Sequence, residues 1–275
     1  MKTRRLEPFN HVTLALFAVL SLFPLYYTFV NSFKNPVQYA QNPLNLPSGF
    51  SPSSYLRALE QIAVPTLNSA FIVLVSVVLI LLFSALAAYA FALLEFPGKG
   101  VLFALVFALL LIPSFLTLIP LYLQIKRLGL SSSHFAVILP YIAAGQAFTI
   151  LVLKTFFEAL PREFIEAARM DGAGDTYLFT RIVVPLSKPA LVSLGVVQVV
   201  ALWNDYLLPQ LVLDTPRRTL TMALVKFQGS AETFTAPDFG ALMAAYTLAA
   251  IPLLILFSFL MRAYIEGLTS GGVKG

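Results

Sequence analysis

Long apolar runs are the feature that most constrains this chain. A helix of about 20 apolar residues spans the roughly 30 Å hydrocarbon core of a bilayer. Six runs approach or exceed that length, at residues 12–31, 67–93, 101–123, 135–153, 190–213 and 240–261. The chain is therefore predicted to be an all-α integral membrane protein with six transmembrane helices, forming a single transmembrane domain over residues 1–275.

Composition supports this fold class and removes several others. Hydrophobic residues make up 59% of the chain and charged residues only 11%, whereas a soluble domain carries about 25% charge. The alternating pattern of a membrane β-barrel is absent. The first run is too long for a signal peptide, and bulky Tyr26, Tyr27 and Phe29 stand where a cleavage site needs small residues.

Little in the sequence points to bound metal or to nucleic acid. The chain has no cysteine, which excludes disulfides and cysteine-ligated metal sites. His11 and His134 are far apart and have no ligand spacing. The net charge of +5 does not come with a basic patch interleaved with surface aromatics. We therefore predict no metal site and no nucleic-acid partner.

The distribution of basic residues predicts the orientation in the membrane. Six spans place both termini on one side, and most of the 18 Lys and Arg residues fall in segments that are cytoplasmic if the N-terminus is inside. Both termini and the 154–188 loop are then cytoplasmic. Residues 31–65 become a proline-containing external loop with a short helix over 53–62, and 214–239 a second external segment.

The loop at 154–188 has the densest charge in the chain. It is predicted to form a helix, a tight turn and a second helix. Pro161 is tolerated in a first turn, Gly172 suits a left-handed helix end, and Asp175 is expected to cap the second helix. Composition leaves two interpretations open: a surface presented to a soluble partner, or an ordinary loop that packs on its own protein.

This loop also resembles a known motif, the EAA loop of ABC importer permeases. The residues that carry the resemblance are Glu166, Ala167, Ala168, Asp171, Gly172, Ala173, Ile182, Pro185 and Leu186. Val184 departs mildly, since leucine is usual there. The tail over 267–275 resembles the end of the maltose-type permeases of the carbohydrate branch, and the resemblance extends over essentially the whole chain.

The resemblance implies a fold, partners and a localisation. It implies the type I importer permease fold in the cytoplasmic (inner) membrane. The 154–188 loop would dock into an ATPase, and the 262–275 tail, with Gly271, Gly272 and Lys274, would face that ATPase. The other expected partners are a second permease subunit, a second ATPase copy and an extracytoplasmic sugar-binding protein. ATP and magnesium would bind the ATPases, and this chain would bind no cofactor.

No enzymatic motif is present. The chain lacks a Gly-x-x-x-x-Gly-Lys-[Ser/Thr] loop and has no nucleophile–base pair at recognisable spacing. No catalytic residue is therefore predicted, and the energy for transport must come from a partner or an ion gradient.

Asp205 is the one acidic residue well inside a predicted span, beside Trp203, Asn204 and Tyr206. A carboxylate, an amide and aromatic rings suit a sugar along a transport pathway. The alternative is a structural cluster near the outer interface, where aromatic residues gather.

The sequence is also compatible with other interpretations. Pro113 and Pro120 predict a kink in the third span, which could serve packing or act as a hinge. An ion-coupled secondary carrier would need an internal repeat and more midplane charge. A structural membrane protein would have no use for the charged Asp-Gly turn. Within the carbohydrate branch, di- and oligosaccharides are expected, with glycerol phosphate-type solutes as an alternative.

Overall fold

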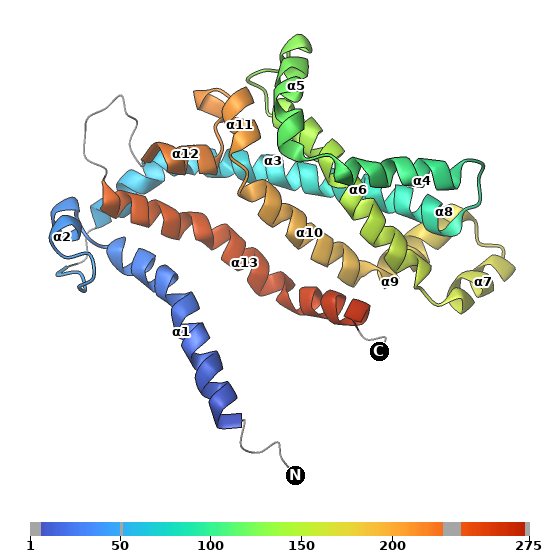
Figure 1. The fold of residues 1–275 in the computed structure, drawn as a ribbon, viewed down its shortest axis with the longest axis horizontal. Coiled ribbons are helices and arrows are strands. Elements are labelled where there is room, and N and C mark those ends of the chain that lie inside the picture. The colour runs from blue at the N-terminus through green and yellow to red at the C-terminus, as the bar shows by residue number, and fades with distance from the viewer. Residues whose placement is uncertain (1–6, 50–51, 228–237, 273–275) are drawn as a thin grey trace. The chain divides into compact units, whose positions relative to one another are not determined.

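A computed structural model describes residues 7–49, 52–227 and 238–272, and every regular element in these ranges is helical (Figure 1). The membrane-length helices and their neighbours are α1 (Glu7–Asn31), α3 (Pro52–Leu93), α4 (Lys99–Ala108), α5 (Ser114–Arg127), α6 (Phe135–Glu158), α10 (Lys188–Trp203) and α13 (Phe239–Gly272). The shorter elements are α2 (Pro36–Gln41), η1 (Leu109–Leu111), α7 (Arg162–Met170), α8 (Asp175–Tyr177), the π-helix η2 (Leu178–Val183), α9 (Val184–Leu186), α11 (Leu207–Val212), η3 (Thr215–Arg217) and α12 (Leu220–Phe227).

Four of the described helices are long and apolar enough to cross a membrane, with spans at Asn10–Asn31, Pro52–Leu93, Phe135–Glu158 and Phe239–Phe259. Two further spans arise if each sharply bent helix pair is counted as one, which brings the number to six. The all-α membrane fold expected from the apolar runs is therefore confirmed.

Two of the predicted spans are each divided between separate helices. Residues 101–123 are shared between α4, η1 and α5, which meet at 99°. Pro113 lies at the break, where its backbone is extended (ψ 125°). Because a proline has no N–H, it cannot donate the hydrogen bond that would continue the preceding helix. Residues 190–213 are shared between α10, which ends at Trp203, and α11. The helical stretch Asp175–Leu186, which comprises α8, η2 and α9, meets α10 at 72° near Ser187. This bend lies before residue 190 and so outside the predicted span.

The segment predicted as an external loop over 31–65 is more helical than expected. The helix expected over 53–62 is present, but it continues without a break into the next span as α3, with Pro65 inside it. The hydroxyl of Thr66 donates to the carbonyl of Ile62 at 2.6 Å. Flanking side chains of this kind help a helix to tolerate a proline, since they bond backbone groups near the interruption.

The described chain divides into two compact units at residues 66/67, 221/222 and 252/253. In the first unit, the chain after α1 is held by a buried hydrogen bond, a ring stack and an ion pair. Ser54 Oγ donates to the carbonyl of Lys34 at 3.2 Å, and the rings of Tyr39 and Phe239 stack at 4.8 Å. Arg57 forms an ion pair with Asp238 at 2.8 Å.

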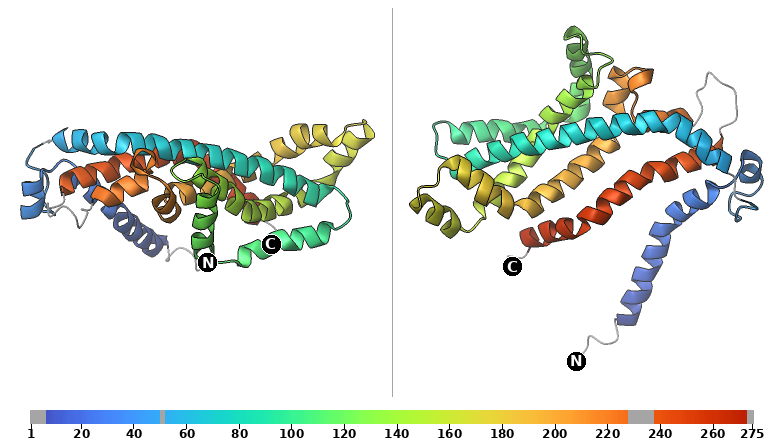
Figure 2. Two further views of the ribbon diagram at one scale, coloured as in Figure 1. Left: turned by 90° about the horizontal axis from the view of Figure 1, so that it is seen from above. Right: turned by 180° about the vertical axis from the view of Figure 1, so that it is seen from behind.

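The second unit is built on α3, α6 and α10. Ser84 Oγ on α3 donates to Gln146 Oε1 on α6 at 2.8 Å, and Gln198 Nε2 on α10 donates to Thr149 Oγ1 on α6 at 3.0 Å. A side chain on Gly145 would collide with Ile80, so glycine is what lets α6 approach α3. The views in Figure 2 show α7 at the end of this unit where α3 meets α4.

Candidate functional site

The loop between α6 and α10 folds as the sequence predicted, as a helix, a turn and a second helical stretch. Pro161 directly precedes α7, Glu163 lies in its first turn and Arg169 in its last. These charges complement the helix dipole. Ile165 is buried, while Glu166 and Ala167 are exposed and Ala168 is half-buried. The motif residues of α7 therefore lie mainly on its outward side.

The turn after α7 is closed by a Schellman motif. The amide of Ala173 donates to the carbonyl of Ala168 at 2.9 Å, and the amide of Gly172 donates to the carbonyl of Arg169 at 3.0 Å. Gly172 has φ +81°, a left-handed conformation that only glycine adopts cheaply. A Cβ at this position would meet nothing within 4 Å, so the requirement for glycine is conformational and not steric.

The second half of the loop differs from the prediction in one respect. Asp175 does not cap the helix: Gly174 occupies the cap position, and Asp175 is the first residue of α8. Its carboxylate instead accepts a hydrogen bond from the Tyr89 hydroxyl on α3 at 3.1 Å. The expected cap was a short-range inference, and a partner 86 residues away outcompeted it.

An apolar cluster anchors the loop to the spans. Leu178 and Val183 on η2 are fully buried beside Leu153 and Phe157 of α6, and Ile182 packs against the same cluster. Pro185 is exposed at the start of α9, next to the bend at Ser187. The recurring apolar residues of the second half of the loop thus face the protein.

The outward side of the loop combines charge with large apolar side chains. Met170 is 88% exposed, and Phe164 and Tyr177 are each 56% exposed. Glu166 is also exposed and lies one turn before Met170 on α7. Apolar side chains held in solvent next to charged ones are typical of a surface that another protein covers.

The 203–206 segment forms a hydrogen-bonded corner between α10 and α11. One carboxylate oxygen of Asp205 accepts from the Tyr141 hydroxyl at 2.6 Å, and the other accepts from the amide of Leu207 at 3.0 Å. Its carbonyl accepts from Thr221 Oγ1 at 2.8 Å. These bonds give Asp205 a structural task, because they fix the start of α11.

The neighbours of Asp205 differ in exposure. Trp203 is buried and Tyr206 is half-buried, whereas Asn204 is exposed and donates to the carbonyl of Val200 at 2.7 Å. The four predicted residues, which are consecutive in the chain, form one corner, and Asn204 is the most exposed of them.

The tail is the third region that the sequence singled out. Helix α13 continues to Gly272, so Gly271 and Gly272 form its last positions. Lys274 lies outside the described residues.

Sequence reasoning missed several polar contacts inside the apolar helices. Gln146, Thr149 and Gln198 bond between α3, α6 and α10 within unit 2, and Asn68 Nδ2 donates to the carbonyls of Pro216 and Arg218. The sequence does contain a signal for these contacts, because a single amide side chain in an apolar run needs a hydrogen-bond partner. Only the fold shows which partner it finds.

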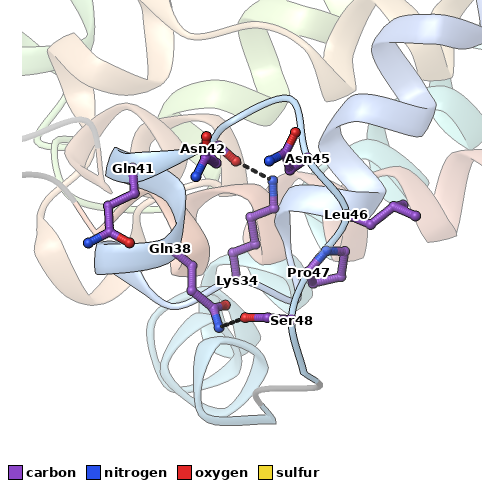
Figure 3. A pocket seen from close by; sticks show the side chains of 8 residues that line it. All are labelled: Lys34, Gln38, Gln41, Asn42, Asn45, Leu46, Pro47 and Ser48. Atoms are coloured by element: carbon purple, nitrogen blue, oxygen red, sulfur yellow. Dashed lines mark hydrogen bonds between the residues drawn. The ribbon is translucent and has the colours of Figure 1, made fainter.

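A pocket of about 170 Å³ lies in the first unit, where the chain after α2 wraps around Lys34 (Figure 3). The Lys34 ammonium donates to the carbonyls of Asn42 and Pro43 at 2.9 and 3.1 Å. Burial lowers the pKa of this ammonium. Because both acceptors are main-chain groups of the wrapping loop, Lys34 organises that loop from its centre.

No group of three or more His, Cys, Asp or Glu side chains gathers as a metal site within the described ranges.

Helices of membrane length define a multi-pass helical membrane protein, and its capped α6–α10 loop carries an exposed face of charged and apolar side chains. Residues 80–269 match the family described as the binding-protein-dependent transport system inner membrane component, and the chain belongs to this family. Membership makes it the membrane component of an ABC transporter, working with an ATPase and a substrate-binding protein.

Relatives and a solved structure resemble the chain over nearly its whole length. The diacetylchitobiose uptake system permease protein NgcG of Streptomyces coelicolor is 30% identical, over 98% of this chain and 89% of that protein. The melibiose/raffinose/stachyose import permease protein MelC of Bacillus subtilis is 31% identical over 100% of both. A crystal structure of a bacterial ABC transporter involved in the import of the acidic polysaccharide alginate matches with a TM-score of 0.82 at 26% identity, covering 94% of this chain and 96% of that one.

Proposed function

We propose that this chain is one of two permease subunits of an ATP-driven importer for a carbohydrate. The observation that carries the proposal is the structure of the 162–186 loop. Its turn is closed at Gly172, buried apolar residues anchor it to the spans, and its outward face carries charged and apolar side chains. NgcG and MelC are both named for the uptake of sugars, and the transporter of known structure is involved in alginate import, which supports that substrate class.

In the proposed mechanism, two ATPase copies bind the loops of two related permease chains. Closure of the ATPases on ATP pulls the loops together, and the attached helices switch between inward- and outward-open states. This chain has no phosphate-binding loop, so ATP and magnesium bind the ATPases, and no cofactor is held here. An extracytoplasmic binding protein delivers the sugar, and both termini of this chain lie in the cytoplasm.

A pull-down tests the assembly. The chain carries a tag at its N-terminus, which leaves the 262–275 tail free, and the complex is solubilised gently and identified by mass spectrometry. We expect a second multi-pass permease and an ATPase with a phosphate-binding loop. A stable chain recovered alone would overturn the proposal.

A charge reversal makes the test specific to the loop. Glu166→Lys should lose the ATPase but keep the second permease, because Glu166 lies on the exposed side of α7. Glu60→Lys is the matched control, since Glu60 is also an exposed helical glutamate but belongs to the first unit. Equal ATPase recovery from both variants would contradict docking through the loop.

Accumulation of radiolabelled diacetylchitobiose, melibiose, maltose and trehalose by cells tests the substrate class. Uptake of at least one of them that is lost in Glu166→Lys supports a carbohydrate importer. Uptake of glycerol 3-phosphate in place of every sugar would contradict it.

A further inference from the structure

Tyr89 connects the last part of α3 to the loop that follows α6. Its side chain is buried at 5% exposure, and its hydroxyl donates to Asp175 Oδ1 at 3.1 Å. Its ring also meets the ring of Phe179 edge-on, with centroids 5.4 Å apart and an angle of 71°. One side chain of a membrane helix thus makes a polar and an aromatic contact with the second half of the loop.

The same carboxylate connects the two halves of the loop. Arg169 Nη2 on α7 lies 3.7 Å from Asp175 Oδ1, the oxygen that accepts from Tyr89. Arg169 and Asp175 are both about half exposed, so their ion pair alone is weak. Its importance is geometric, because it places α7, α8 and α3 around one oxygen atom.

The bond to Tyr89 differs in kind from the contacts that surround it. The apolar cluster around Leu178 and Val183 holds the loop against the spans, but hydrophobic contact is non-directional and permits sliding. A hydrogen bond and an edge-on ring pair depend on angle and therefore fix rotation and register. The phenol is buried, so losing its acceptor would leave a polar group without compensation.

From these contacts we propose that Tyr89 is a positioning residue that makes α3 follow the loop when the ATPase moves it. The inference rests on the proposed function, because it needs an ATPase bound to the loop. Asp175 is the acceptor that completes the connection, and Phe179 sets the orientation of the ring.

The first test compares Tyr89→Phe with Tyr122→Phe in the complete purified transporter. Tyr89→Phe removes one hydroxyl and keeps the ring against Phe179. Tyr122 is a half-buried tyrosine on α5, which provides the same chemical change away from the loop. The measurement is sugar accumulated in proteoliposomes per ATP hydrolysed, using whichever of the four radiolabelled sugars above the wild type takes up.

We expect Tyr89→Phe to lower this ratio about fivefold, the effect of one lost hydrogen bond on a conformational step. Recovery of the ATPase in the pull-down and the melting temperature of the complex should stay near wild type. Tyr122→Phe should leave the ratio unchanged. A normal ratio in Tyr89→Phe, or a fall equal to that in Tyr122→Phe, would overturn the inference.

A double-mutant cycle tests whether the hydroxyl acts through Asp175. Asp175→Ala removes the acceptor and should lower the ratio by itself, and the double variant should be no worse than the stronger single variant, because both substitutions remove the same hydrogen bond. Effects that multiply would mean that the two residues act separately, and the proposed connection would be wrong.

A third measurement does not depend on the sugar. The chain has no native cysteine, so spin labels can be attached at Leu82→Cys on α3 and Thr180→Cys on η2, both exposed positions. In the wild type the label–label distance should be the same without nucleotide and with ATP, magnesium and vanadate. In Tyr89→Phe the distribution should broaden or shift on trapping, and an unchanged distribution would contradict the proposal.

The proposed function and the proposed role of Tyr89 can be contradicted separately. If the proposed function is wrong, the wild-type chain recovers no ATPase in the pull-down. If only the role of Tyr89 is wrong, the wild type assembles and transports, while Tyr89→Phe matches it in both the transport ratio and the label distance.

Discussion

Two glycines, Gly172 in the loop after α7 and Gly240 at the start of α13, are required for opposite physical reasons. Gly172 has a left-handed backbone and open space around it. Gly240 has no left-handed backbone, but a Cβ there would collide with the carbonyl of Lys34 and approach Ser54 Oγ to 3.0 Å. The first glycine is required by its own turn, and the second by Lys34, which is 206 residues away in the chain.

The two glycines lie in two kinds of region in this protein. The turn at Gly172 is specified locally, since its cap bonds run between residues a few positions apart. The packing at Gly240 is specified by the fold, since nothing near it in sequence predicts the approach of Lys34. Substitutions that add one methyl group at each site should therefore destabilise the protein for different reasons.

The largest effect is expected for Gly240→Ala. The new methyl group would meet main-chain atoms, which cannot rotate away, and the first unit should lose roughly 3 kcal/mol of stability, the upper range for overpacking. Thermal unfolding of the detergent-solubilised complex measures this. Gly49→Ala is the control, because a Cβ there meets nothing within 4 Å. Equal melting temperatures for the two variants would show that α13 can move aside.

Gly172→Ala should cost less, about 1–2 kcal/mol, because the penalty is that of a left-handed alanine. Gly174→Ala is a close control, since Gly174 is two residues away, equally open and has φ −77°. Gly172→Asn should recover part of the loss, because asparagine tolerates this backbone better. Hydrogen exchange of the α7 amides in the complex measures the local effect. Identical exchange in Gly172→Ala and Gly174→Ala would mean that the Schellman closure does not stabilise α7.

Asp205→Asn should destabilise the corner before α11 by about 1 kcal/mol, since an NH₂ group replaces an oxygen that accepts a hydrogen bond. Asn204→Ala should change stability little, because its side chain is exposed. Together the two variants distinguish a structural role of the corner from a role in transport. If the corner contacts the solute, Asn204→Ala lowers sugar uptake and leaves the melting temperature unchanged. A large loss of stability in Asn204→Ala would contradict this division of roles.

The smallest effect is a pH dependence from His134. Burial, and to a lesser degree Arg217, lowers the pKa of this imidazole, while Asp214 opposes the shift. The folded state therefore binds fewer protons than the unfolded state, so stability falls as pH drops from about 6.5 through the lowered pKa. His134→Gln should remove this part of the pH dependence of the melting temperature. An unchanged profile in the variant would assign the acid sensitivity to another group.

Much of the fold could be predicted from the sequence because apolar length and turn chemistry act locally. The apolar runs indicated the membrane helices, and Pro161 and Gly172 indicated the limits of α7. Bends were harder to place, because a proline such as Pro113 permits a break of 99° but Pro65 is carried inside a continuous helix. Neighbouring helices and side chains, which no short stretch of sequence specifies, decide between those outcomes.

In the candidate site too, some residues could be identified from the local sequence and others only from the fold. Glu166, Ala167, Ala168 and Gly172 could be named from the motif they resemble, and the structure places them in a capped, outward-facing loop. Asp175 could not be assigned correctly, because a helix cap and a bond to Tyr89 both suit a carboxylate. Distant contacts decided the role of Asp205 as well, through Tyr141 and Thr221.

By itself, the sequence determined that this chain is a membrane protein, that its polar loop turns at Gly172, and which family it resembles. Those properties depend on the hydrophobicity and backbone preferences of residues close together in the chain. Only the tertiary structure decided that Gly240 lies against the Lys34 carbonyl and that Tyr89 holds the loop through Asp175. Such contacts depend on which helices meet, and that is fixed by the packing of the whole unit and not by any short stretch of residues.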